Sequence, residues 1–135
     1  MLSRKLAVIA AVLPSSLKYK MECLRPLYSL AVRWGEPFVD IDTTAGRLHW
    51  HVDSLTSQRH ILGTYEPLMQ KAFVRFIRPG AVVYDVGAHA GFHSLFCALL
   101  VGSSGRVFAF EPEPGCRRSL QRQIEVNPQL RVTAL

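Results

Sequence analysis

The sequence predicts an α/β domain built on parallel strands, and three observations indicate this fold. Residues 82–86 form an apolar run that ends at a glycine turn, and residues 106–111 form a second such run. Between the two runs, apolar residues recur at spacings of three and four, as on one face of a helix. These residues are Phe92, Leu95, Phe96, Leu99 and Leu100. Strand, helix and strand in this order form a right-handed crossover that leaves the strands parallel.

The composition is that of one globular domain with a basic flank. The chain has 135 residues, of which 49% are hydrophobic and 19% charged, so a disordered chain is excluded. The net charge is +6, and much of the excess base lies in the first 35 residues, at Arg4, Lys5, Lys18, Lys20, Arg25 and Arg33. Such a flank favours an anionic partner such as lipid or nucleic acid, although a solvated face is the simpler interpretation.

Residues 1–35 read as a basic amphipathic helical segment, interrupted near Pro14. The apolar run at residues 6–13 is far shorter than the ~20 residues that span a bilayer, and no small-residue cleavage site follows it. We therefore expect a segment that packs on the domain or lies on a membrane surface. Three cysteines without metal-ligand spacing predict reduced thiols and a cytoplasmic protein, peripheral to the membrane at most.

Residues 36–79 predict a β-hairpin and a lead-in helix. The segments 38–42 and 47–52 alternate in polarity on either side of a turn. His49 and His51 share one face of the second strand, which we interpret as a polar outer face, because the sequence places no third ligand for a metal.

A polar connector is expected over residues 54–60, before this helix. Pro67 suits the first turn of the helix. The helix is expected to bury one stripe of apolar side chains. These are Met69, Phe73, Phe76 and Ile77.

Residues 80–135 form a βαβαβ pattern with a buried first strand. The second strand, 106–111, leads into a helix that Pro112–Gly115 opens, and residues 130–135 begin a third strand. In a parallel sheet the ligand lies beyond the carboxyl ends of the strands. Asp85 ends the first strand and Glu111 ends the second, so both carboxylates are expected to point at one crevice.

Two ligand classes compete for this crevice. A dinucleotide site requires G-x-G-x-x-G, whereas Gly87-Ala-His-Ala-Gly91 lacks the middle glycine. Asp85 at the mouth of the turn would repel a phosphate, but it suits the amino and sulfonium groups of S-adenosylmethionine. Glu111 suits either ligand, because a carboxylate there can accept both ribose hydroxyls. The charges favour S-adenosylmethionine over NAD, and a glycine turn without any ligand is the third interpretation.

Four elements together resemble the FkbM-type methyltransferases. They are the segments Gly63-Thr-Tyr-Glu-Pro67, Val83-Tyr-Asp-Val-Gly-Ala-His-Ala-Gly-Phe-His-Ser94 and Gly105-Arg-Val-Phe-Ala-Phe-Glu-Pro112, followed by Asn127. The resemblance covers about residues 36–135. It implies a Rossmann-like class I domain that binds S-adenosylmethionine and transfers its methyl group to an oxygen.

The resemblance also implies the site residues. The first cofactor motif of this family matches Asp85, Gly87 and Gly91, and Ala88 and His89 between them are expected to bind the cofactor too. The ribose-binding acid of the family matches Glu111, and the upstream acid of its Tyr-Glu-Pro element matches Glu66. His89 stands where such proteins more often carry Asn. His89 and His93 lie four residues apart, which resembles metal spacing, and His93 could act as a general base. A polar surface position is the better interpretation of both histidines, and we predict no metal.

The family's domain resembles a seven-stranded sheet, and this chain reaches only the third strand. We therefore expect residues 80–135 to be an incomplete half-domain that binds the cofactor weakly and is inactive alone. The bare edge of the first strand predicts self-association. A non-catalytic remnant of the fold and an NAD-dependent dehydrogenase half-domain are the alternatives. The expected methyl acceptor is a small molecule, glycan or glycolipid, and no nucleic acid is expected to bind.

Overall fold

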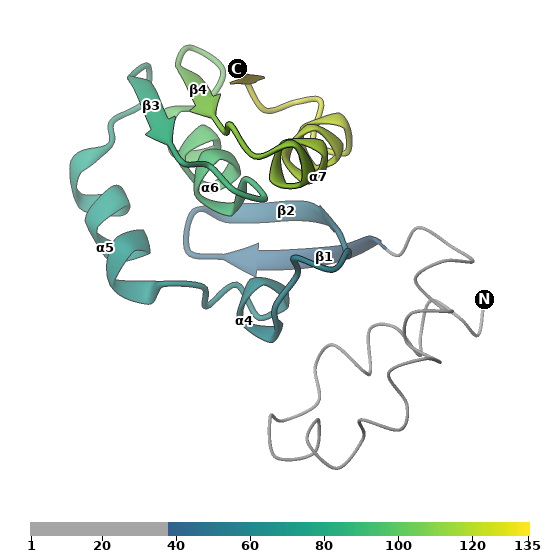
Figure 1. The fold of residues 1–135 in the computed structure, drawn as a ribbon. Coiled ribbons are helices and arrows are strands. Elements are labelled where there is room, and N and C mark those ends of the chain that lie inside the picture. Colours follow the sequence, from purple (N-terminus) through teal and green to yellow (C-terminus); the bar gives the residue numbers. More distant parts are fainter. Residues whose placement is uncertain (1–37) are drawn as a thin grey trace.

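A computed structural model describes residues 38–135 of the chain, and these form two sheets and four helices (Figure 1). The elements in order are β1 Phe38–Thr43, β2 Gly46–His51, α4 Gln58–Ile61, α5 Pro67–Phe76, β3 Val82–Val86, α6 Phe92–Val101, β4 Arg106–Phe110, α7 Pro114–Glu125 and β5 Val132–Ala134. The helical segment predicted for residues 1–35, with its membrane contact, lies outside the described residues.

The second half of the chain forms a parallel sheet in the order β3-β4-β5. Val82 pairs with Arg106 and Val86 with Phe110, so β3 and β4 are in register along their whole length. The shorter β5 continues the sheet, with Val132 opposite Val107. Both crossovers carry a helix, and the predicted βαβαβ pattern is confirmed.

Helix α6 lies between the parallel sheet and the hairpin (Figure 1). One side of the helix packs on the sheet, where Cys97, Ala98 and Val101 form a buried cluster with Val107. The other side carries Phe92 and Leu95 towards the hairpin. A helix that is apolar on all sides is stable only when both sides are covered, which explains why the strands lie on either side of it.

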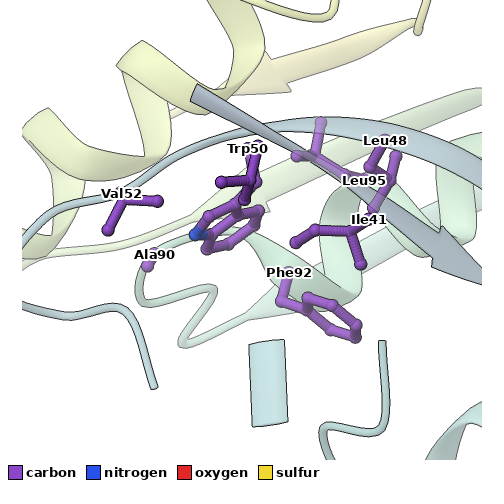
Figure 2. Packing of buried hydrophobic residues seen from close by; sticks show 8 residues of the cluster. Ile41, Leu48, Trp50, Val52, Ala90, Phe92 and Leu95 are labelled. Atoms are coloured by element: carbon purple, nitrogen blue, oxygen red, sulfur yellow. The ribbon is translucent and has the colours of Figure 1, made fainter. Parts of the chain in front are cut away.

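The hairpin and the start of α6 together form the largest buried cluster of the described residues, which Figure 2 shows. Alternating residues of β1 and β2 point at α6, and Trp50 packs edge-on against Phe92 with their ring centroids 5.8 Å apart. The buried residues labelled there are Ile41, Leu48, Trp50, Val52, Ala90, Phe92 and Leu95. The predicted hairpin, with its alternating apolar face, is confirmed.

The other face of the hairpin differs from the prediction, because His51 is not on a polar outer surface. It is 4% exposed and packs edge-on against Phe38. Helix α7 covers this end of β2, where Gln123 and Asn127 bond to the strand's backbone. Asn127 accepts from the His49 N–H at 3.0 Å and donates to the His49 carbonyl at 2.6 Å. His49 itself stays exposed beside Asp40.

Two predictions for the middle of the chain are wrong in part. The segment 54–60 is not a plain connector, because α4 begins at Gln58 and buries His60. On α5, Phe76 is 72% exposed and Met69 is also exposed, while Gln70 is buried. Gln70 is buried because its amide donates to the carbonyls of Gly63 and Tyr65, both at 2.8 Å.

One face of the parallel sheet is open in the described structure. Val82, Tyr84 and Val86 alternate along β3 and are exposed, with Val86 at 82%, so the prediction of a fully buried strand is wrong. Tyr84 stacks on Phe108 of the neighbouring strand at 5.5 Å. As predicted, β3 lies at the edge of the described sheet. No helix within residues 38–135 is long and apolar enough to cross a bilayer.

Candidate functional site

The turn between β3 and α6 is shaped by three residues with left-handed backbone. Gly87, His89 and Gly91 have φ values of 84°, 51° and 89°. A side chain on Gly91 would meet the buried Leu120, since its Cβ would lie 2.5 Å from Leu120 Cδ1. No heavy atom lies within 4 Å of the corresponding position at Gly87, so the side of the turn next to the strand is open. His is among the residues enriched at left-handed positions, as Asn is, which explains how it fits at residue 89.

Glu111 holds this turn against the end of β4. Its Oε2 accepts from the backbone N–H of His89 at 2.7 Å, and its Oε1 accepts from the N–H of Glu113 at 2.8 Å. Glu111 is 7% exposed. The amides of Gly87 and Ala88 both bond to the Phe110 carbonyl, at 2.9 and 3.1 Å. The predicted acid is therefore in place beside the turn, with a second lone pair left on each carboxylate oxygen.

A cavity of about 190 Å³ opens beside the turn. It is smaller than the roughly 300–1,000 Å³ of complete ligand pockets, so it has room for only part of a typical ligand. Its lining residues are His60, Tyr65, Glu66, Asp85, Gly87, Ala88, His89, Ala90, Phe92 and His93. Five of the seven predicted site residues therefore line the cavity, whereas Gly91 and Glu111 are not among its lining residues.

Asp85 is fixed in the cavity wall by a residue that the sequence analysis missed. Ser94, fully buried in the first turn of α6, donates its hydroxyl to Asp85 Oδ2 at 2.6 Å. A single hydroxyl within an otherwise apolar helix turn was the available signal, because a buried hydroxyl requires a partner. This bond leaves the other carboxylate oxygen free to accept from a ligand.

Glu66 and His93 form a second polar pair in the wall. Glu66 precedes α5 with a left-handed φ of 47°, and its Oε2 lies 3.6 Å from His93 Nε2. Burial lowers the pKa of His93 below its ordinary value, against the opposing pull of Glu66 and Asp85. Among residues 38–135, no three His, Cys, Asp or Glu side chains are arranged to hold a metal ion.

Aromatic rings complete the wall, and His60 is the centre of this group. Its ring lies 4.1 Å from that of Tyr65 and 5.4 Å from that of Phe92, and it stacks on Trp50. Burial lowers the pKa of His60 to about 4, so the ring is neutral at pH 7. Its Nδ1 accepts from the Ser57 N–H at 3.0 Å. Neither His60 nor Tyr65 was predicted as a site residue, because His60 lies on the short helix α4, in a segment expected to be a polar connector, and Tyr65 was noted only as part of the Tyr-Glu-Pro element.

Comparison with solved structures identifies the fold. A candidate transferase from Pyrococcus horikoshii matches with a TM-score of 0.51 at 15% identity, over 86% of this chain and 48% of that one. The fold is Rossmann-like. No family model matches the chain, and neither does any curated protein.

Two other solved structures match the chain with TM-scores below 0.5. A candidate rRNA methylase from Clostridium thermocellum has 26% identity and a TM-score of 0.48, over 51% of this chain and 38% of that one. An S-adenosylmethionine-dependent O-methyltransferase from Thermotoga maritima has 23% identity and a TM-score of 0.47, over 71% and 39%. The chain spans less than half the length of each of these three proteins.

Proposed function

We propose that the chain carries the S-adenosylmethionine site of a methyltransferase of the FkbM type that methylates an oxygen. The observation that carries this proposal is the charge of the cavity. Glu66 and Asp85 contribute two carboxylates, and none of its ten lining residues is Lys or Arg. A cation is therefore favoured there, although the chain as a whole has a net charge of +6.

The described residues fit the cofactor in two parts. The small cavity suits its cationic amino-acid end, which Asp85 and Glu66 would hold. The ribose would lie at Glu111, which retains acceptor capacity for its hydroxyls. When bound, the cofactor would supply an electrophilic methyl group on its sulfonium. The chain's own contribution is positioning.

A dinucleotide fits less well. Its pyrophosphate requires close approach to the turn, yet the middle position is His89 and the adjacent Asp85 carries negative charge. The remaining alternative is a fold that binds no cofactor and serves as an interaction module. The binding of either nucleotide distinguishes these possibilities.

The test is calorimetric titration of the purified chain with S-adenosylmethionine and, separately, with NADH. We expect binding of S-adenosylmethionine only, and a loss of about tenfold or more in affinity for Asp85→Asn, as removal of a charge contact predicts. Asp42→Asn is the matched control, because Asp42 is an exposed carboxylate of the hairpin paired with Arg47. Binding of NADH alone, or of neither ligand, would overturn the proposal.

The methyl acceptor, the partners and the cellular location of the protein are also proposals. We propose a hydroxyl of a small molecule, glycan or glycolipid as the acceptor, no nucleic acid as a partner, and a cytoplasmic location. Peripheral membrane contact would come from the basic residues 1–35. Flotation with vesicles containing anionic lipid, compared with neutral vesicles, measures that contact directly. Equal recovery with both kinds of vesicle would argue against it.

A further inference from the structure

The imidazole of His93 presents a buried nitrogen without a partner. Its Nε2 is shielded from solvent and makes no hydrogen bond. The nearest carboxylate oxygen, Glu66 Oε2, is 3.6 Å away, which is too long for a hydrogen bond. Buried polar groups in folded proteins are almost always paired, so an unpaired one in a cavity wall points to a group that the site receives from outside.

The surroundings of His93 fix its orientation and its protonation. The ring stands in the first turn of α6 and contacts three aromatic neighbours, Tyr65, Phe73 and Phe92, at centroid distances of 5.3 to 5.9 Å. Burial lowers the pKa of His93, so the ring is neutral at pH 7. A neutral imidazole has one nitrogen that accepts, and the tautomer with hydrogen on Nδ1 presents Nε2 as that acceptor.

The groups that share the cavity define what Nε2 would accept from. Glu66 and Asp85 are acceptors with negative charge. His60 is neutral at pH 7, since its pKa is about 4. The cavity therefore combines two anionic acceptors with a neutral one. A primary ammonium, which has one positive charge and three N–H donors, matches this set.

We propose that His93 Nε2, together with Glu66 and Asp85, binds the primary ammonium of the amino-acid end of S-adenosylmethionine. This inference rests on the proposed function and adds a specificity-determining residue to it. Glu66 Oε2 and His93 Nε2 lie 3.6 Å apart, so one ammonium can donate to both of them. The cavity would then select the cofactor by its free amino group.

The experiment compares two ligands on two variants. S-Adenosylmethionine carries the ammonium, whereas 5′-methylthioadenosine keeps the nucleoside and the sulfur but has no amino group. We expect His93→Phe to weaken binding of S-adenosylmethionine by about tenfold or more, as loss of a charge-assisted hydrogen bond predicts. Its affinity for 5′-methylthioadenosine should stay unchanged. His93→Gln restores an acceptor, so its affinity for S-adenosylmethionine should exceed that of His93→Phe.

The outcomes separate this inference from the proposed function. If the wild-type chain binds S-adenosylmethionine and His93→Phe binds it equally well, His93 has no part in recognition and only this inference fails. Equal weakening of both ligands by His93→Phe also overturns it, because the effect would then be structural. If the wild-type chain binds neither ligand, the proposed function fails and this inference fails with it.

Discussion

The side-chain amide of Gln123 pairs with the backbone of His51 in the way that a neighbouring β-strand would. Its Oε1 accepts from the His51 N–H at 2.8 Å, and its Nε2 donates to the His51 carbonyl at 2.8 Å. Asn127, one helical turn later, pairs with His49 in the same manner. Gln123 in α7 and Asn127, two residues beyond the end of that helix, thus satisfy backbone groups along the edge of β2.

Replacing Gln123 should therefore destabilise the fold. Gln123→Ala removes both hydrogen bonds and leaves buried groups of His51 unpaired, so we expect the free energy of unfolding to fall by about 3 kcal/mol. Gln121→Ala is the matched control, because Gln121 lies on the exposed face of the same helix. Its effect should stay within about 0.5 kcal/mol. Urea unfolding followed by circular dichroism measures both, and similar losses would contradict the role of the amide pair.

Alanine substitution should destabilise the fold by different amounts at the two glycines of the turn. Gly87→Ala requires a left-handed alanine in open space, which costs about 1–2 kcal/mol. Gly91→Ala carries the same backbone cost, and it also forces a methyl group against Leu120 in the core. Overpacking adds roughly 1–3 kcal/mol, so Gly91→Ala should be clearly the less stable variant. Thermal unfolding compares the two, and equal stability would show that Leu120 yields freely.

The buried His60 predicts acid sensitivity. Because burial lowers its pKa to about 4 in the folded chain, the unfolded chain binds a proton near pH 6.5 that the folded chain does not. The free energy of unfolding should then fall as pH drops from about 6.5 to 4, by up to about 1.4 kcal/mol per pH unit for this group. His93 contributes in the same direction, since burial also lowers its pKa.

The measurement is urea unfolding over this pH range for the wild type and for His60→Gln. The glutamine can still accept from the Ser57 N–H but does not titrate, so the decline in stability towards acid pH should be shallower. An unchanged decline would mean that His60 is not the group responsible.

The exposed strand β3 predicts association between copies of the chain. We propose that the edge of β3 pairs with a second copy, as the unpaired edge of a sheet favours. Tyr84→Lys places a charge on this apolar strand and should shift the sedimentation coefficient towards the monomer at a given concentration. Leu68→Lys, at an exposed apolar position of α5, is the control and should leave it unchanged. A wild-type chain that is monomeric at all concentrations would refute this proposal.

The elements of the fold were predictable because their signals are local. The alternation in β2, the spacing of apolar residues in α6 and the position of Pro67 each act within one element. The burial of His51 was not predictable, because it depends on Gln123, 72 residues later in the chain. The exposed face of α5 was missed for a similar reason, since apolar periodicity does not reveal which face finds a partner.

The same contrast between local signals and long-range packing applies to the candidate site. Asp85 was identified because it ends a strand, and Glu111 for the same reason, and both lie beside the glycine turn. The aromatic wall around His60 was not predicted, because it depends on the packing of α4 and the loop after it against Phe92 at the start of α6. Side chains that the sheet topology positions can be predicted from the sequence. Contacts that depend on how separate segments pack together cannot.

The bond between Glu111 and the His89 amide has a consequence for how tightly any ligand binds. It orders the turn during folding, before a ligand arrives. Fixing the backbone of one residue costs about 1–2 kcal/mol, and a turn that is already fixed spares the ligand that cost. Preorganisation of this kind raises affinity without adding a contact. We therefore expect Glu111 to strengthen the binding even of a ligand fragment that never touches it.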